Sequence, residues 1–358
     1  YFNMYSHYDD IGAYNSKESP YFSWYKFINW PDEYHSWWGI KLLPEVIEED
    51  EGYRNYICGE NGILKKWLRC GIAGYRLDVA DELPDIFLDD LRKSVKSENE
   101  NAIIIGEVWE DATNKFAYGQ RRKYLLGEEL DSVMNYPFAD AILNFVRYAN
   151  GNAFFNAVLS IIENYPPQVL NVLMNHIGTH DTERAITRLA GENPDGHDRA
   201  WQFEHNTLSE FDYLKGISMM KIASLIQFTL PGVPSIYYGD EIGMQGMKDP
   251  FNRACMPWDK PNEELLKWYK RLGQIRHSSK AFIDGDFEKL YCDGGVIAYS
   301  RSSEGDNILV AINNSNEQKR IFVGTQWDNS YSLFDEKSVD GFVNLPPCRY
   351  TLLSKKEY

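Results

Sequence analysis

The chain has 358 residues, a length that predicts a barrel-sized domain with a smaller one rather than one small domain. It carries 37 Lys and Arg against 53 Asp and Glu, and this net charge of -16 argues against nucleic acid or an anionic membrane as a partner. Hydrophobic residues form 43% of the sequence, and no apolar run approaches the length of a membrane span, so we expect a soluble protein with a sizeable core.

The cysteines show neither a disulfide framework nor the spacing of a zinc site. They are scattered along the chain at Cys58, Cys70, Cys255, Cys292 and Cys348. We expect reduced, mostly buried side chains, which favours a cytoplasmic location. Secretion stays an alternative, because the chain begins at Tyr1 without an initiator Met and a leader could have been removed.

Aromatic residues are densest near the start, in the segment SPYFSWYKFINWPDEYHSWWGI. One interpretation is a local core that needs large rings because it has little regular structure. The other is a set of flat apolar faces for sugar rings, and the two are compatible. We treat residues 1–52 as one aromatic-rich region.

Helix-like and strand-like segments alternate through the middle of the chain. In ENGILKKWLRC the apolar residues recur at helical spacing, with Asn61 as a candidate cap, and a long helix is expected from about Ala139 to Asn164. Candidate strands lie near residues 73–79, 102–108, 132–138, 170–176 and 233–239. This order predicts an α/β fold with parallel strands whose functional residues lie at the C-terminal strand ends.

The pattern changes at about Ala281, where short alternating runs are separated by Gly, Asn and Asp. Such runs are typical of an antiparallel sheet. We therefore divide the rest of the chain into an α/β region, residues 53–280, and a C-terminal antiparallel β-sandwich domain, residues 281–358.

Acidic residues follow three of the predicted strands, at Asp78, Glu107 and Asp181. In GYRLDVADE, alternation places Arg76 and Asp78 on one side of a strand. Each acid alone could be a helix cap or a solvated loop residue. A parallel barrel would bring all three to one mouth, and glycoside hydrolysis needs two carboxylates that face one bond.

The surroundings of the first two acids differ. The guanidinium of Arg76 favours the ionised form of Asp78, whereas the apolar run before Glu107 predicts desolvation, which disfavours its ionised form. Such a difference supplies an anion and an acid at the same pH. The alternative for Arg76 and Asp78 is a purely structural ion pair.

The segments GYRLDVADE, IIGEVWEDA and HIGTHDTER resemble three conserved regions of the α-amylase family, glycoside hydrolase family 13, and most of all its neopullulanase and cyclomaltodextrinase branch. GVPSIYYGDEIGM and MPWD resemble further segments of that family. The resemblance implies a (β/α)8 TIM-type barrel and retaining cleavage of α-glucans. It implies Asp78 as the nucleophile, Glu107 as general acid and base, and Asp181 as a third carboxylate that binds sugar hydroxyls.

The same resemblance suggests substrate-binding residues. His180 lies beside Asp181, and Arg76 would keep Asp78 ionised. Trp109 and Tyr238 are candidate sugar platforms, although either could simply pack. No cofactor is implied as required and no metal ligand is assigned, but calcium is possible because many family members hold it near the region of Asp9, Asp10 and Asp50.

The sequence also departs from the family pattern. We find about five of eight barrel strands, and the Asn-His segment that ends the third strand is absent. Residues 1–52 resemble the tail of the excursion after that strand. We therefore expect a fragment completed by a longer polypeptide or another chain, with a strand-sharing homodimer as an alternative.

The expected activity is hydrolysis of α-1,4 bonds in maltooligosaccharides, cyclodextrins, starch or pullulan, with α-1,6 bonds as a second option. The same three carboxylates would also serve a transglycosylase. A non-catalytic glucan-binding protein is the alternative from another class. A nucleotide-binding protein is a distant third, because no strand is followed by a Gly-rich phosphate loop.

Overall fold

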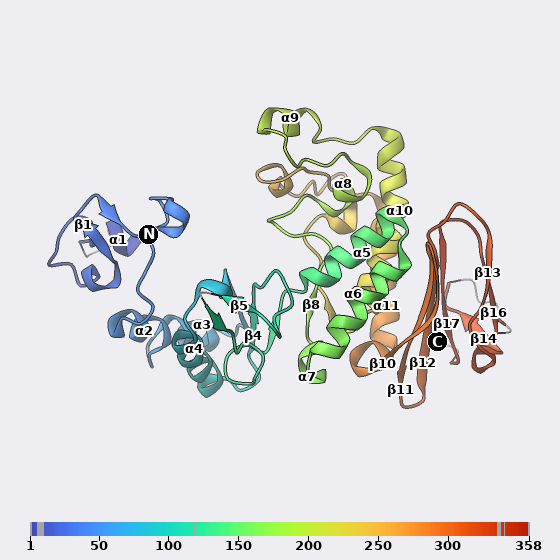
Figure 1. Ribbon diagram of the computed structural model, residues 1–358, viewed down its shortest axis with the longest axis horizontal. Helices are drawn as coiled ribbons and strands as arrows, with labels where there is room; N and C mark the ends of the chain where they lie inside the picture. The colour runs from blue at the N-terminus through green and yellow to red at the C-terminus, as the bar shows by residue number, and fades with distance from the viewer. Residues whose placement is uncertain (1, 6–10, 118, 335–337, 340, 357–358) are drawn as a thin grey trace. The chain divides into compact units, whose positions relative to one another are not determined.

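The computed structural model describes residues 2–5, 11–117, 119–334, 338–339 and 341–356 (Figure 1). The chain forms two compact units. Unit 1 comprises Tyr1–Val108 and Ala112–Val133, and unit 2 comprises Trp109–Asp111 and Met134–Tyr358. Both helices and strands are present, as the sequence predicted.

The start of unit 1 has little regular structure and a core of its own. Its helix and strands are short: α1 (Phe2–Tyr5), β1 (Phe27–Asn29) and β2 (Glu33–Tyr34). Met4, Ala13, Trp24 and Tyr25 form a buried cluster with partly buried tyrosines around it. Large rings therefore supply this local core, in agreement with the first interpretation of the aromatic segment.

The rest of unit 1 alternates helices with strands of one parallel sheet. The helices are α2 (Glu51–Cys58), α3 (Ile63–Arg69) and α4 (Asp85–Glu98). The sheet has the order β3-β4-β7, formed by β3 (Gly74–Leu77), β4 (Ile103–Gly106) and β7 (Ser132–Val133), and all its pairings are parallel. A two-stranded hairpin, β5 (Phe116–Ala117) and β6 (Gln120–Arg121), lies between β4 and β7 in sequence.

Close backbone approaches favour glycine at the start of β3 and just before α3. Gly74 has φ +155, and a Cβ there would lie 2.0 Å from the Ile103 carbonyl oxygen, so only Gly permits this approach of β3 to β4. At the start of α3 the prediction of Asn61 as cap was wrong. Gly62 is the capping residue and, without a side chain, offers no capping bond. A Cβ at this position would lie 2.6 Å from the Ile57 carbonyl oxygen, which favours Gly there.

Unit 2 begins with packed helices and a pair of parallel strands. Its helices are α5 (Tyr136–Tyr148), α6 (Gly151–Asn164), α7 (Pro167–Leu170), α8 (Ala185–Ala190), α9 (Arg199–Glu204), α10 (Glu210–Thr229), α11 (Glu263–Ser278) and α12 (Ala281–Asp284). The strands β8 (Met174–Asn175) and β9 (Val233–Pro234) pair in parallel, and Met134 forms a parallel bridge to Met174. All five predicted strands exist, each shorter than predicted.

The single helix expected from about Ala139 to Asn164 is two helices. Ala149 takes a left-handed conformation with φ 55, which ends α5. The Asn150 side chain then accepts a hydrogen bond from the Ala153 backbone nitrogen at 3.0 Å and so caps α6. Figure 1 shows α5 and α6 side by side. Apolar periodicity continues through both helices and hides this turn.

The C-terminal part of unit 2 is antiparallel. Its larger sheet has the order β10-β11-β12-β17-β14-β15, with β10 (Asp286–Asp293), β11 (Val296–Ser303), β12 (Asp306–Asn313), β17 (Arg349–Ser354), β14 (Ser330–Ser332) and β15 (Ser338–Val339). A second sheet pairs β13 (Lys319–Phe322) with β16 (Phe342–Leu345). Side chains from both sheets, including Leu309, Ile321 and Val343, share one buried cluster.

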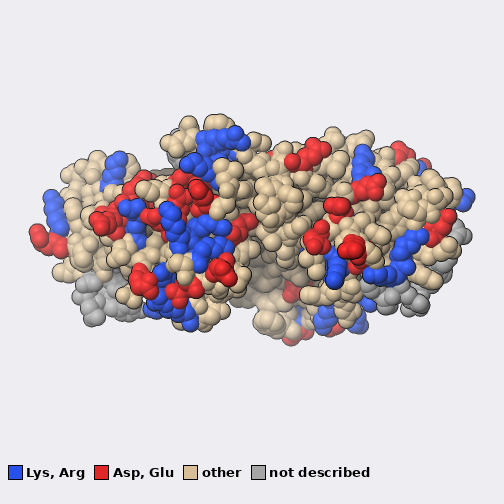
Figure 2. Space-filling model, turned by 90° about the horizontal axis from the view of Figure 1, so that it is seen from below, with Lys and Arg blue, Asp and Glu red and all other residues tan. Residues whose placement is uncertain are grey.

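The surface is charged and carries unpaired thiols. Figure 2 shows acidic and basic side chains interspersed over the face drawn. All five cysteines are free, but Cys70, Cys255 and Cys348 are exposed, so the expectation of mostly buried thiols was wrong. Cys70 caps the end of α3 and Cys348 has φ 53, and both are thus turn residues at the surface. In the described part of the chain no helix is long and apolar enough to cross a membrane.

Replacing Ala149 with Gly should stabilise the protein. The left-handed conformation is strained for Ala and unstrained for Gly, so the free energy of unfolding should rise by about 1 kcal/mol. Urea denaturation followed by circular dichroism measures the change. Ala157→Gly, inside α6, is the matched control and should lower the same quantity by about 1 kcal/mol. A loss of stability in Ala149→Gly would contradict the prediction.

Candidate active site

The turn after β3 carries Asp78 and is fastened to the end of β4. The Leu77 carbonyl accepts from the Glu107 backbone nitrogen at 3.0 Å, and the Ala80 nitrogen donates to the Glu107 carbonyl at 3.2 Å. Between them, Val79 has φ 41 and ψ 54, a left-handed conformation that is rare for a β-branched residue. The strand therefore ends before Asp78, and the turn is held by the backbone of Glu107.

One guanidinium contacts two of the predicted catalytic carboxylates. Arg76 Nη1 forms an ion pair with Asp78 Oδ1, and Arg76 Nη2 lies 3.0 Å from Glu107 Oε2. The same Glu107 oxygen accepts a hydrogen bond from the Val79 nitrogen at 2.8 Å. The sequence prediction gave Arg76 only the first partner. The parallel register brings in the second, because Leu77 pairs with Gly106 and Glu107 follows directly.

The two carboxylates differ in accessibility. The Asp78 side chain is 75% exposed, whereas the Glu107 side chain is 7% exposed. The predicted burial of Glu107 is present, and the positive charge of Arg76 lies beside it. Asp78 can thus meet a ligand directly, and Glu107 is held in a fixed orientation.

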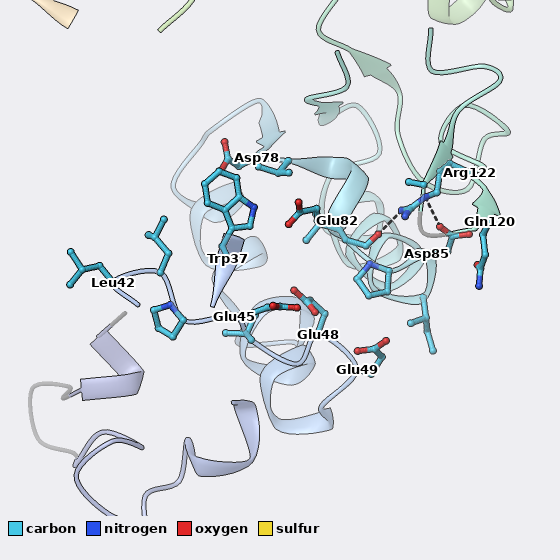
Figure 3. Close-up of a pocket in the computed structure, with 18 residues that line it drawn as sticks. Trp37, Leu42, Glu45, Glu48, Glu49, Asp78, Glu82, Asp85, Gln120 and Arg122 are labelled. Carbon is cyan, nitrogen blue, oxygen red and sulfur yellow. Dashed lines mark hydrogen bonds and ion pairs between the residues drawn. The ribbon is translucent and has the colours of Figure 1, made fainter. Parts of the chain in front are cut away.

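Asp78 lines a cleft of 860 Å³ in unit 1 (Figure 3). The lining combines apolar side chains with carboxylates: Trp37, Leu42, Leu43, Pro44, Val46, Val79, Leu83, Pro84 and Ile86 beside Glu45, Glu48, Glu49, Glu82 and Asp85. Burial, with the nearby charges of Glu49 and Glu45, raises the pKa of Glu48 to about 7. Arg122 also lines the cleft and forms an ion pair with Asp85, with its Nε 3.1 Å from Asp85 Oδ1. Such a lining suits a ligand with both apolar faces and hydroxyl groups.

Asp181 belongs to unit 2, on the loop after β8. Its backbone nitrogen donates to Thr179 Oγ1 at 3.2 Å, and its two carboxylate oxygens lie 3.2 Å from His180 Nε2 and 3.4 Å from Arg253 Nη2. The predicted neighbour His180 is therefore in contact. Arg253 was missed, because nothing in the sequence connects it with a residue 72 positions earlier.

Trp109 rests on a stack of rings in unit 2. Its ring lies 4.1 Å from the Tyr136 ring at an angle of 12°, and Tyr136 meets His176 edge-on at 4.5 Å. Burial, with the charge of Arg188, lowers the pKa of His176 to about 3, so this imidazole is neutral. Trp109 is 47% exposed and, with Asp181, lines a pocket of 440 Å³.

Tyr238 packs against a buried cation. The Arg184 guanidinium is 0% exposed and lies 4.2 Å and 4.4 Å from the ring centroids of Tyr237 and Tyr238. Arg184 also donates to the Tyr238 carbonyl, and the Tyr238 hydroxyl donates to the Ala254 carbonyl at 2.7 Å. The packing role that the sequence left open is thus present, while 39% of Tyr238 remains exposed.

The seven predicted site residues are divided between the units. Unit 1 holds Arg76, Asp78 and Glu107, which are in contact through Arg76. Unit 2 holds the other predicted residues: Trp109, His180, Asp181 and Tyr238. The structure thus brings predicted residues together in two places. Arg76 links Asp78 to Glu107, and His180 contacts Asp181.

The acids considered for calcium do not form a site among the described residues. Asp50 caps α2, since its side chain accepts from the Tyr53 nitrogen at 2.9 Å. Asp9 and Asp10 lie outside the described residues. Within the described ranges no three His, Cys, Asp or Glu side chains are grouped so that they could hold a metal ion.

Asp240 should make stability depend on pH. Burial, strengthened by Glu241 and opposed by Arg184, raises its pKa from the ordinary value of 3.8 to about 7. The folded state thus keeps a proton that the unfolded state has lost, so the contribution of Asp240 is complete below about pH 4 and is lost as the pH rises through 7. Asp240→Asn cannot ionise. Its stability relative to wild type should improve between pH 4 and 8, by an amount on the order of 4 kcal/mol.

Thermal unfolding of both proteins across this pH range measures the difference. Asp259→Asn, at an exposed position, is the control and should show no such trend. A difference between Asp240→Asn and wild type that stays constant with pH would contradict the prediction.

The chain is similar in sequence to known glucan-degrading enzymes. Residues 14–329 match the family described as the α-amylase catalytic domain. The chain is 33% identical over 321 residues to a cyclomaltodextrinase of Thermoanaerobacter pseudethanolicus, covering 86% of this chain and 50% of that protein. It is 32% identical over 371 residues to an amylopullulanase of Thermoanaerobacter thermohydrosulfuricus, covering 91% of this chain and 24% of that protein.

A solved structure gives the same result. The debranching enzyme of Nostoc punctiforme is similar with a TM-score of 0.77 and 26% identity, over 96% of this chain and 71% of that one. The chain spans half or less of the two curated relatives. By the extent of the family match and by these identities, the chain belongs to the α-amylase catalytic-domain family of glycoside hydrolase family 13.

Proposed function

We propose that this chain carries the site of a retaining α-glucan hydrolase. The proposal is carried by one observation: the guanidinium of Arg76 contacts both Asp78 and Glu107, which follow two neighbouring parallel strands. Two carboxylates of unequal exposure, held by one cation, suit the two roles of glycoside hydrolysis. Family membership and relatives named cyclomaltodextrinase and amylopullulanase support α-glucans as the substrate class.

Asp78 is the nucleophile in this proposal. Its exposed carboxylate attacks the anomeric carbon, the bond from that carbon to the glycosidic oxygen breaks, and a covalent β-glycosyl ester forms. The ion pair with Arg76 places a positive charge beside this carboxylate. The left-handed turn at Val79 supports this role, since backbone strain is often kept where it places a functional group.

Glu107 is the general acid and then the general base. It gives its proton to the departing glycosidic oxygen, then takes a proton from the water that attacks the glycosyl ester, which releases Asp78 and retains the anomeric configuration. Glu107 Oε2 accepts a hydrogen bond from the Val79 nitrogen and forms an ion pair with Arg76, and both contacts restrict the orientation of the carboxyl group. Such preorganisation lowers the cost of proton transfer in the transition state.

The unit 2 residues are proposed to bind the sugar. Asp181, with His180 beside it, would accept hydrogen bonds from sugar hydroxyls and favour the distorted ring of the transition state. Trp109 and Tyr238 each keep an exposed portion of ring that could contact a sugar face. The cleft beside Asp78, with apolar and carboxylate lining, would accept further glucose units of the chain.

We also propose the finer architecture that the family match supports. The parallel strands β3, β4, β7, β8 and β9 would be five strands of a (β/α)8 barrel within residues 53–280. The sheets beyond residue 281 would form the C-terminal β-sandwich, and residues 1–52 would belong to the excursion that precedes this part of the barrel. The bonds cleaved would be α-1,4, with α-1,6 as the alternative.

A transglycosylase with the same three carboxylates is the second candidate. The glycosyl ester on Asp78 can pass to a sugar hydroxyl instead of water, and access to the ester decides between them. We expect hydrolysis products to dominate at low maltoheptaose concentration. Products longer than maltoheptaose, seen by chromatography at high substrate concentration, would select the transglycosylase.

Proton NMR of maltoheptaose with the purified chain tests the proposed mechanism. We expect the α-anomer of the product to appear first, because two inversions retain the configuration. Glu107→Gln cannot transfer the proton and should lower the rate of cleavage by about 10²- to 10⁴-fold. Glu128→Gln, at an exposed position of unit 1, is the matched control and should retain the wild-type rate.

Other outcomes have distinct meanings. An early β-anomer would exclude retention and with it the role of Asp78. Turnover that survives in Glu107→Gln would remove Glu107 from the mechanism. If neither protein turns over but calorimetry detects equal maltoheptaose binding in both, the chain is a glucan-binding protein instead.

A further inference from the structure

Asn252 is a fully buried amide that reaches the loop of Asp181. It lies in the 3₁₀ turn Phe251–Arg253 of unit 2 and is 0% exposed. Its Nδ2 donates to the carbonyl of His180 and to the carbonyl of Thr182, each at 2.7 Å. These are the residues immediately before and after Asp181, so a single side chain fastens the backbone on both sides of the carboxylate.

The chemistry of the amide explains why Asn occupies this position. Both partners are carbonyl oxygens and accept only, so the nitrogen, with its two hydrogens, must face them. Asp, Leu and Ala offer no donor here, and Ser offers one. The Asn252 Oδ1 is buried without a hydrogen-bond partner in the described part of the chain. An unsatisfied buried oxygen destabilises the fold. The contribution of this amide therefore comes from its nitrogen, which donates both hydrogen bonds.

The turn that carries Asn252 is itself anchored. The Tyr237 hydroxyl donates to the Asn252 carbonyl at 3.3 Å, and the Tyr237 ring lies over the buried Arg184. The next residue, Arg253, contacts Asp181 Oδ1 at 3.4 Å and forms an ion pair with Asp249 at 2.7 Å. The donor therefore comes from a fixed support.

We propose that Asn252 is a positioning residue for Asp181. The His180 carbonyl belongs to the peptide that leads into Asp181, and the Thr182 carbonyl belongs to the peptide one residue beyond it. The two hydrogen bonds thus fix the backbone at both ends of the short segment that carries the Asp181 carboxylate. A carboxylate that acts mainly on a distorted transition-state ring loses far more from a small displacement in the transition state than in the ground state. The inference rests on the proposed function, because it assumes that Asp181 serves turnover.

Steady-state kinetics of maltoheptaose cleavage test this role. Asn252→Leu keeps the branched shape of the side chain and removes both donors, so kcat should fall by roughly 10- to 100-fold. KM should change less than about threefold, because the loss is confined to the transition state. Asn252→Ser keeps one donor and should lose less than the Leu variant, and it serves as the test protein if Asn252→Leu does not fold.

A double-mutant cycle separates positioning from a general structural effect. If Asn252 acts through Asp181, its replacement in an Asp181→Asn background should change kcat by less than about twofold. A full effect of Asn252 replacement in both backgrounds would overturn the proposal. So would unchanged kcat in the single variants.

Asn314 offers a matched control within unit 2. Its Nδ2 also donates to two carbonyls, those of Phe145 and Val146, each at 2.9 Å. Asn314→Leu should lower the melting temperature as Asn252→Leu does but leave kcat unchanged. A comparable loss of kcat in Asn314→Leu would attribute the effect to stability and overturn the proposal.

Failure of the proposed function gives a different pattern. If wild type binds maltoheptaose without turnover, the proposed function fails and the premise that Asp181 serves turnover fails with it, whereas an active wild type with unchanged kcat in Asn252→Leu overturns only the role of Asn252. If wild type neither binds nor cleaves maltoheptaose, the proposed function fails and this inference fails with it.

Discussion

The parallel pairing of β3 with β4 is the constraint on which the candidate site in unit 1 depends. It places Glu107 next to the turn that follows β3, where a nearly buried carboxylate requires a positive partner. Arg76, two residues before Asp78, provides that partner and reaches both acids. Gly74 permits the close approach of the two strands at the other end. The β3–β4 register, the turn after β3 and the ion pairs of Arg76 therefore depend on one another.

Unit 2 holds its carboxylate in another way. Asp181 is supported by a segment about 70 residues later, in which Asn252 fastens the backbone and Arg253 contacts the side chain. Unit 1 uses residues that are neighbours along one strand pair. Asp78 is largely exposed and Asp181 partly exposed, while Glu107 and Asn252, which hold the backbone beside them, are buried. This is the arrangement expected when a side chain must meet a ligand from a fixed position.

The interior of unit 2 near Asp181 is unusually polar. Arg184, Asp240 and Asn252 are all buried, and each has a polar atom without a hydrogen-bond partner among the described residues. Stacking on Tyr237 and Tyr238 compensates part of the desolvation of Arg184. An apolar interior would be more stable, so these buried polar groups lower the stability of unit 2 around the loop that carries Asp181.

The sequence by itself determined the order of helices and strands, the acids at the strand ends and the family, because periodicity and short motifs are properties of neighbouring residues. It located Arg76 beside Asp78 and His180 beside Asp181. Only the tertiary structure decided that Arg76 also contacts Glu107, that Ala149 divides one apolar pattern into two helices, and that Asn252 and Arg253 support Asp181. Contacts between residues far apart in the chain leave no periodic signal in sequence, since they arise only when folding brings a donor to its acceptor.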